Sequence, residues 1–130
     1  MISLQELENL CMDRLDDAKV LFQAARYEGA FYICGYVVEV GLKRAICRTL
    51  GWIGFPQTKS EFERLSSFKT HDLEILLHLS GRETEIKEKY FSEWSVVTSW
   101  EPEIRYSSEK RTPQKVESML MAAEKLLRIL

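Results

Sequence analysis

The stretch YEGAFYICGYVVEVGLKRAICRTL, from Tyr27 to Leu50, decides the fold. Nearly every residue between Ala30 and Ala45 is apolar or small, and two apolar lines run through the stretch at helical spacing. A helix that is apolar on two faces must be covered by neighbours on both sides. The stretch is far longer than most strands, which outweighs its β-branched valines. It therefore predicts a buried central helix about 36 Å long, and Gly51 supplies its C-terminal stop.

Two glycines and one carboxylate inside this helix require close neighbours. Gly35 and Gly41 each cost about 1 kcal/mol relative to Ala, a cost that tight helix–helix packing offsets. Glu39 stands four residues before Lys43, which is the favourable order for an ion pair. Because apolar residues surround Glu39, we expect its carboxylate to have a buried or half-buried partner.

Capping signals divide the rest of the chain into further helices. Ser3 with Glu6 forms a capping box, which marks the start of a first helix. Thr70 is expected to cap a shorter third helix, and Thr112 followed by Pro113 opens the last one. Together with the central stretch, the predicted helices cover about 4–25, 27–50, 71–80, 83–99 and 113 onward.

The order of these segments indicates an all-α fold. The sequence shows no strand pattern and no internal repeat, and the short link between the first two helices predicts an antiparallel hairpin. We expect an up-and-down antiparallel helical bundle of four main helices plus a shorter helix. At 130 residues the chain can bury a sizeable core, and we predict a single domain over 1–130.

Composition is that of an ordinary soluble protein. Hydrophobic residues make up 45%, and a net charge of −2 gives no global attraction to nucleic acid. No signal peptide or membrane-spanning run is recognisable, so we expect a cytoplasmic protein with no membrane partner. Cys11, Cys34 and Cys47 lie on apolar helical faces and lack metal-ligand spacing, which predicts buried free thiols, no metal and no cofactor.

The segment from Ala24 to Ile46 resembles the signature helix of HEPN domains (higher eukaryotes and prokaryotes nucleotide-binding). That signature spaces a Tyr, an Ala, a Glu, a Leu and a Lys along one helix, and the matching residues are Tyr27, Ala30, Glu39, Leu42 and Lys43. Val37 and Arg44 depart from it, since the family has Ala at both places. Thr70 onward and Trp100 to Tyr106 also resemble the family, so the resemblance covers nearly the whole chain.

The resemblance implies either a metal-independent ribonuclease or a non-catalytic relative. The nuclease motif is an Arg followed, four to six residues on, by a His near the start of the last helix. Its chemistry needs a cation at the scissile phosphate and an imidazole that transfers protons with the ribose 2′-hydroxyl. Arg105 stands at a suitable place, but no His follows it. We therefore expect a non-catalytic domain.

A ribonuclease that uses Arg64 and His71, or Arg105, is the first alternative. Six residues separate Arg64 from His71, which the motif permits, but the pair lies in the wrong part of the chain. The structural interpretation is that His71, at the start of its helix, bonds a neighbouring backbone group or carboxylate. A purely structural helical scaffold is the second alternative.

The one concentrated positive stretch precedes the last helix. Lys110 and Arg111 stand beside the N-terminus of that helix, where anions bind readily, and Arg105 is close in sequence. Tyr106 supplies an aromatic ring on which a base can stack. These four residues are the predicted nucleotide- or anion-binding site, and the alternative is a solvated loop whose charge neighbouring glutamates dilute.

The resemblance further implies an interaction or nucleotide/RNA-binding module in a toxin–antitoxin or nucleotidyltransferase-associated system, with a separate nucleotidyltransferase as a candidate partner. We also expect a homodimer with a charged cleft, because four large apolar residues lie in or beside irregular segments, where a small bundle has trouble burying them. These residues are Trp52, Phe55, Trp94 and Trp100. A twofold axis near the start of the last helix would double the positive charge there.

Overall fold

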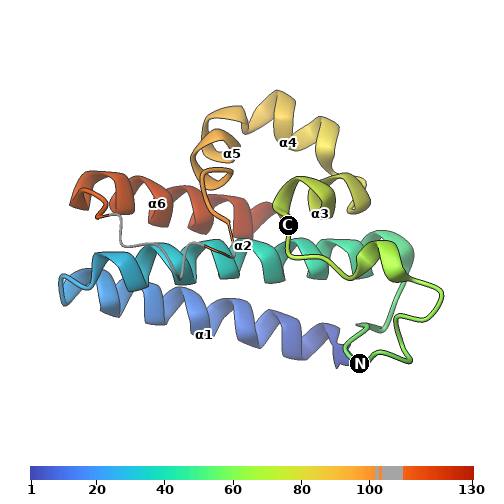
Figure 1. Cartoon of the computed structure of the whole chain (residues 1–130). Helices are drawn as coiled ribbons and strands as arrows, with labels where there is room; N and C mark the ends of the chain where they lie inside the picture. Colours follow the sequence, from blue (N-terminus) through green and yellow to red (C-terminus); the bar gives the residue numbers. More distant parts are fainter. Residues whose placement is uncertain (102, 104–109) are drawn as a thin grey trace.

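The computed structural model describes residues 1–101, 103 and 110–130, and helices dominate that part of the chain (Figure 1). The predicted all-α class is confirmed. The helices are α1 (Leu4–Gln23), α2 (Tyr27–Leu50), α3 (Leu73–Leu79), α4 (Glu83–Lys89), α5 (Phe91–Val97) and α6 (Pro113–Ile129), with a 3₁₀ turn η1 at Ser66–Phe68.

The central helix has the predicted bounds and the predicted position. Figure 1 shows α2 between α1 on one side and α6 on the other, with α3, α4 and α5 forming a group above α2 and α6. Buried residues lie all around α2, from Ala30 to Cys47, because neighbours cover it on both sides. Its end is the predicted one, since Gly51 is left-handed with φ 67° and its N–H reaches the Cys47 carbonyl.

The capping groups predicted for the starts of the other two long helices, α1 and α6, are present. At the start of α1 the Glu6 N–H donates to Ser3 Oγ at 3.2 Å, while the Ser3 N–H donates to Glu6 Oε2 at 2.7 Å. This is the predicted capping box. At α6 the Lys115 N–H donates to Thr112 Oγ1 at 3.2 Å, and Pro113 is the first helical residue.

Two predicted helix boundaries are wrong. The cap of α3 is Asp72, whose Oδ1 accepts from the Ile75 N–H at 3.1 Å, whereas Thr70 accepts from the Asp72 N–H. The predicted helix over 83–99 is two helices, because the chain turns at Tyr90, with φ −130° and ψ 32°. The fourth main helix is thus replaced by a pair of seven-residue helices, α4 and α5.

The expectation of no strand is also corrected. Ile2–Ser3 (β1) pairs antiparallel with Gly54–Phe55 (β2), in a ladder of two residues per strand. Ladders this short show no alternating pattern, so the sequence carries no signal for them. The pairing brings the connection after α2 back to the start of α1.

Two arginines of α2 bind the C-terminal end of α6. The buried Arg44 donates from Nη2 to the Leu127 carbonyl at 2.8 Å, and Arg48 donates from Nη1 to the Leu130 carbonyl at 2.9 Å. Cations at a helix C-terminus satisfy carbonyls that lack helical partners and complement the helix dipole. Both side chains therefore join two elements of the bundle.

The large apolar residues outside the long helices are mostly buried within the chain. Phe55 and Trp94 are each 2% exposed and Trp100 is 4% exposed, while Trp52 is half-buried against Phe68 and Phe55. Phe55, Trp94 and Trp100 therefore leave almost no exposed aromatic surface for the homodimer interface that the sequence suggested.

Candidate functional site

Glu39 lies at the base of a pocket on the outer face of α2. Its side chain is 4% exposed, and its Oε2 accepts from Lys43 Nζ at 2.8 Å and lies 2.9 Å from His71 Nδ1. The predicted half-buried partner is therefore Lys43, which sits one turn along the same helix. The second partner comes from the segment before α3, 32 residues away in sequence.

His71 joins the start of α3 to the central helix. One ring nitrogen faces Glu39, but the imidazole is 67% exposed. The structural interpretation, in which His71 bonds a neighbouring carboxylate, describes this contact. Carboxylate–imidazole pairs fix the orientation of the ring, which serves structure and proton transfer equally well.

Trp100 forms an aromatic wall of the pocket. Its indole lies directly on Gly35, so closely that a Cβ at that position would clash with the ring. The indole Nε1–H donates to the Tyr32 carbonyl at 3.0 Å, and the Tyr32 ring lies 6.0 Å from the indole. The close packing predicted at Gly35 exists, but its neighbour is a side chain from the segment after α5 instead of a helix.

Tyr36 adds a second phenol one turn along α2. Burial, and next the nearby Glu39 carboxylate, raise the pKa of Tyr36. Both effects disfavour the phenolate. The hydroxyl therefore remains a neutral hydrogen-bond donor at neutral pH.

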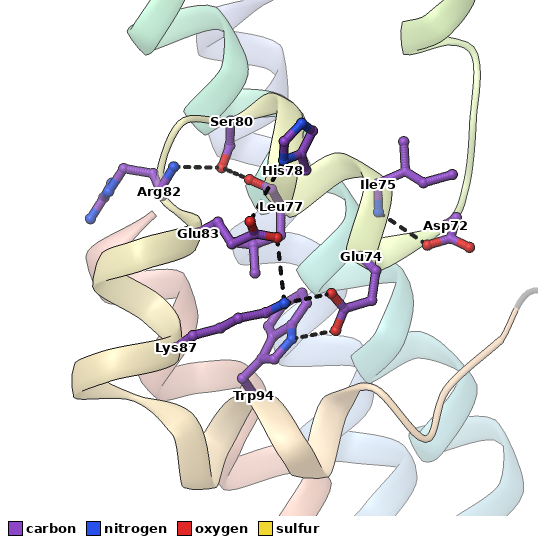
Figure 2. Close-up of polar contacts among 10 residues, drawn as sticks. All are labelled: Asp72, Glu74, Ile75, Leu77, His78, Ser80, Arg82, Glu83, Lys87 and Trp94. Carbon is purple, nitrogen blue, oxygen red and sulfur yellow. Dashed lines mark hydrogen bonds and ion pairs between the residues drawn. The ribbon is translucent and has the colours of Figure 1, made fainter.

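Glu74 of α3 lines the pocket, and Figure 2 shows the polar contacts that hold it. Glu74 accepts from Trp94 Nε1–H at 2.8 Å and pairs with Lys87 at 3.1 Å. Lys87 also reaches Glu83 at 3.4 Å, so α4 is joined to α3 through Lys87, while α5 is joined to α3 through the Trp94–Glu74 bond. At the other end of the same view, the buried Ser80 turns the chain from α3 into α4 by donating to the Leu77 carbonyl at 2.6 Å.

The resulting pocket has a volume of about 950 Å³. Its lining combines aromatic rings from α2 and Trp100 with carboxylates from three segments. The described residues that line it are Tyr32, Tyr36, Glu39, Thr70, His71, Asp72, Leu73, Glu74, Thr98, Trp100, Glu101 and Glu103. Five of these twelve are acidic, and none of them is Lys or Arg.

The predicted anion-binding residues do not line this pocket in the described part of the chain. Arg111 is 7% exposed at its side chain, where Nη1 pairs with Glu28 Oε2 at 2.7 Å and the guanidinium lies 4.2 Å from the Phe31 ring centre. The Arg111 N–H also donates to Glu28 at 2.6 Å. Lys110 is exposed, whereas Arg105 and Tyr106 lie outside the described residues. Anion binding at these residues stays a prediction.

The remaining candidate residues have separate positions. Tyr27 packs edge-to-face on Phe22, with 5.5 Å between ring centres, and so stabilises the α1–α2 turn. Arg64 is exposed in the turn before η1 and does not line the pocket beside His71. Lys43, besides its bond to Glu39, lies over the Phe55 ring at 5.3 Å.

The cysteines are buried and free in this structure. Burial raises the pKa of the Cys11 thiol to about 11 and that of Cys34 to about 12. Neutral, buried thiols are poor nucleophiles and poor ligands. Within the described residues, no group of three or more His, Cys, Asp and Glu side chains is placed to hold a metal ion. No helix of that part is both long and apolar enough to cross a membrane.

A scan against protein-family models identifies the chain as a HEPN domain over residues 11–130. The chain belongs to the HEPN domain family. This confirms the resemblance carried by the α2 signature residues. Searches of the curated proteins and of the solved structures found no match. HEPN membership supports a general relation to nucleotides or RNA and leaves the individual role of this chain to its own residues.

Sequence reasoning missed most of the residues that form the pocket of this HEPN domain. It singled out Glu39 and His71 separately, and it noted Trp100 as surplus apolar surface and as the start of a segment that resembles the family, without relating it to either residue. No local pattern joins Tyr32 to Trp100, because the contact spans 68 residues. The usable signal was Gly35, whose missing side chain indicates that another group must come close.

Proposed function

We propose that this chain is a non-catalytic HEPN domain that acts as an interaction module. The observation that carries the proposal is the charge of the pocket around His71. Among the described residues, its lining holds five carboxylates and no Lys or Arg. Ribonuclease chemistry requires a cation at the scissile phosphate, and carboxylates in its place repel the phosphodiester.

Two of the described cations near α2 are already paired with carboxylates. Lys43 is bound by Glu39, and Arg111 is bound by Glu28 and covered by Phe31. Both are held by carboxylates of α2, where they stabilise the fold. Together with the absence of a His after Arg105 in the sequence, this supports a role in binding instead of cleavage.

An RNA-cleavage assay tests the proposal. Purified protein is incubated with a mixed-sequence single-stranded RNA in buffer with EDTA, beside a His71→Ala variant. We expect no cleavage above background from either protein. Cleavage by the wild type that disappears in His71→Ala, with the variant folded by circular dichroism, would replace the proposal with the ribonuclease alternative.

One observation favours that alternative. His71 is exposed to solvent while Glu39 holds one of its ring nitrogens, and a carboxylate orients the imidazole in the same way in catalytic pairs. In this mechanism His71 would transfer the proton of the 2′-hydroxyl, with Arg64 or Arg105 as the cation at the phosphate. The alternative therefore needs one of these arginines to reach the pocket.

The biological setting that we propose follows from family membership. The HEPN resemblance implies a role in a toxin–antitoxin or nucleotidyltransferase-associated system. A nucleotidyltransferase is therefore the first partner to test. A pull-down from cells that express both proteins, with a matched unrelated nucleotidyltransferase as control, checks it. Nucleotide or RNA binding at Lys110 and its neighbours is a further proposal, tested by titration of Lys110→Ala.

A further inference from the structure

We propose that the acidic pocket beside Glu39 receives an arginine side chain from a partner protein. The inference rests on the proposed non-catalytic binding function and names the chemistry of the partner. It is carried by the shape, the aromatic walls and the charge of one pocket. It uses only described residues, among them Glu101 and Glu103.

The walls of the pocket suit a planar cation. The half-buried rings of Tyr32 and Tyr36 line the pocket, and the Trp100 indole, which is 4% exposed, lies behind them at 6.0 Å from the Tyr32 ring with a tilt of 41°. A guanidinium stacks on aromatic faces and is more weakly hydrated than an ammonium group. Arginine is thus favoured over lysine by the same walls.

The rim provides the matching acceptors. Glu101 and Glu103 are exposed after Trp100, and Asp72 and Glu74 line the same pocket from the start of α3. Lys87 forms an ion pair with Glu74, and the Ile75 N–H donates to one oxygen of Asp72. Among the described residues, no side chain or backbone N–H pairs with Glu101 or Glu103. A guanidinium donates in a fork that matches a carboxylate in two parallel hydrogen bonds.

The size of the pocket favours a protein over a small cation. A volume of about 950 Å³ lies near the upper end of the range for whole ligands, so one side chain leaves room for its backbone and neighbouring residues. A free polyamine is also cationic, but it would leave the aromatic walls largely uncovered. An anionic partner such as RNA is disfavoured by Asp72, Glu101 and Glu103, the lining carboxylates that pair with no cation among the described residues.

A titration followed by nuclear magnetic resonance tests the inference on the full chain. The probe is the blocked peptide Gly-Gly-Arg-Gly-Gly, and the control peptide carries citrulline, the neutral isostere of arginine. The signal is the indole N–H of Trp100, which bonds the Tyr32 carbonyl at the pocket wall. We expect a saturable shift with the arginine peptide and binding at least about tenfold weaker with citrulline.

A charge-matched pair of variants locates the binding. Glu101→Gln with Glu103→Gln removes two exposed rim carboxylates, while Glu63→Gln with Glu88→Gln removes two exposed carboxylates that do not line the pocket. We expect about fivefold weaker binding in the first pair and an unchanged affinity in the second. Equal affinities in the two pairs would show diffuse attraction and overturn the inference.

Three further outcomes would each count against the inference. An unchanged Trp100 signal at saturating arginine peptide would overturn the site. Spermidine that binds as tightly as the peptide would identify a small cation, and a single-stranded RNA that shifts Trp100 would identify an anionic ligand, each against the inference. RNA cleavage measured on the same sample reports on the proposed function alone, so the two can fail separately.

Discussion

At Gly35 the α2 backbone lies directly under the Trp100 indole, so this position has no room for a side chain. The sequence predicted the close approach, because a glycine inside a helix is costly unless something packs against it. It could not predict the partner, since Trp100 is far away along the chain and the contact depends on the path after α5. The same holds for Glu39, whose need for a partner was evident and whose bond to His71 was not.

Gly35→Ala should destabilise the fold by about 1–3 kcal/mol, because the added methyl displaces the indole and overpacks the site. The effect outweighs the gain of about 1 kcal/mol in helix propensity. Urea denaturation followed by circular dichroism measures it. The control is Gly29→Ala on the same helix, where the nearest atom to a new Cβ is a Leu21 methyl carbon at 3.6 Å and a small stabilisation is expected. Similar results for the two variants would refute the packing of Trp100 on Gly35.

Alkaline pH should destabilise the protein through its buried thiols. The pKa of Cys11 is raised to about 11 and that of Cys34 to about 12, from an ordinary value of 9.0, because burial disfavours the thiolate. The folded state therefore keeps its protons where the unfolded state loses them. The stability from both thiols is complete below pH 9 and falls as the pH rises towards 11 and 12, by up to about 1.4 kcal/mol per pH unit for each thiol.

The slope of unfolding free energy against pH, measured between pH 9 and 10.5, checks this effect. Cys34→Ala loses one of the three thiols whose pKa burial raises, and it should show a shallower slope than the wild type, whatever its absolute stability. Tyr36, whose pKa is also raised, is present in both proteins and so cancels in the comparison. Identical slopes would mean that Cys34 is accessible to solvent in the folded protein.

At the scale of elements, local chemistry determined where the long helices begin and end, and packing determined the rest. Ser3, Gly51 and Thr112 acted as predicted because each cap satisfies groups within a few residues of itself. At α3, Thr70 and Asp72 are both good capping residues, and the structure uses Asp72. The turn at Tyr90 has no Gly or Pro to announce it. It redirects α5 so that Trp94 reaches Glu74, which is a tertiary requirement.

The ion pair between Glu28 and Arg111 should be worth more than an ordinary surface pair, because it joins the starts of α2 and α6 and the guanidinium is nearly buried. Glu28→Ala leaves that guanidinium without its charged partner, and we expect a loss of about 1–3 kcal/mol, compared with the 0–1 kcal/mol of exposed pairs. Exposed Glu117→Ala on α6 is the control and should change stability by much less.

A double variant separates the pair from the helix positions. Arg111→Met removes the cation whose burial is costly, so the combination with Glu28→Ala should recover part of the loss. Thermal denaturation of the four proteins gives the coupling free energy. Strict additivity of the two single changes would show that Glu28 and Arg111 act independently, against the contact in the structure.

At the scale of the whole molecule, the pocket is assembled from parts that only the complete fold brings together. The α2 wall was recognisable as an important helix. The start of α3 reaches it through the connection after α2, and Trp100 and Glu101 reach it only after the turn at Ser80 and the break at Tyr90. Sequence reasoning placed functional weight on the positive stretch before α6. The described structure instead gathers carboxylates and aromatic rings at one site.

The homodimer is the remaining prediction at this scale, and the structure changes its argument. Phe55, Trp94 and Trp100 are buried, so they provide no exposed surface for an interface. The argument for a dimer now rests on the pairing that the HEPN resemblance implies and on the proposed axis near the start of α6. Two copies of Lys110 and Lys115, both exposed, would then face each other with like charge.

Such an interface has a specific salt dependence. Repulsion between the two positive clusters weakens the dimer at low ionic strength, and salt screens it, so the dissociation constant should fall as salt is added. Sedimentation equilibrium of the 15.2 kDa chain at micromolar concentration measures it. Lys110→Gln should tighten the dimer at low salt and change little at high salt, while Lys59→Gln, an exposed lysine far along the chain, serves as the control. A monomer at every salt concentration would reject the dimer. A dimer that weakens with salt would place its axis at a surface of complementary charge instead.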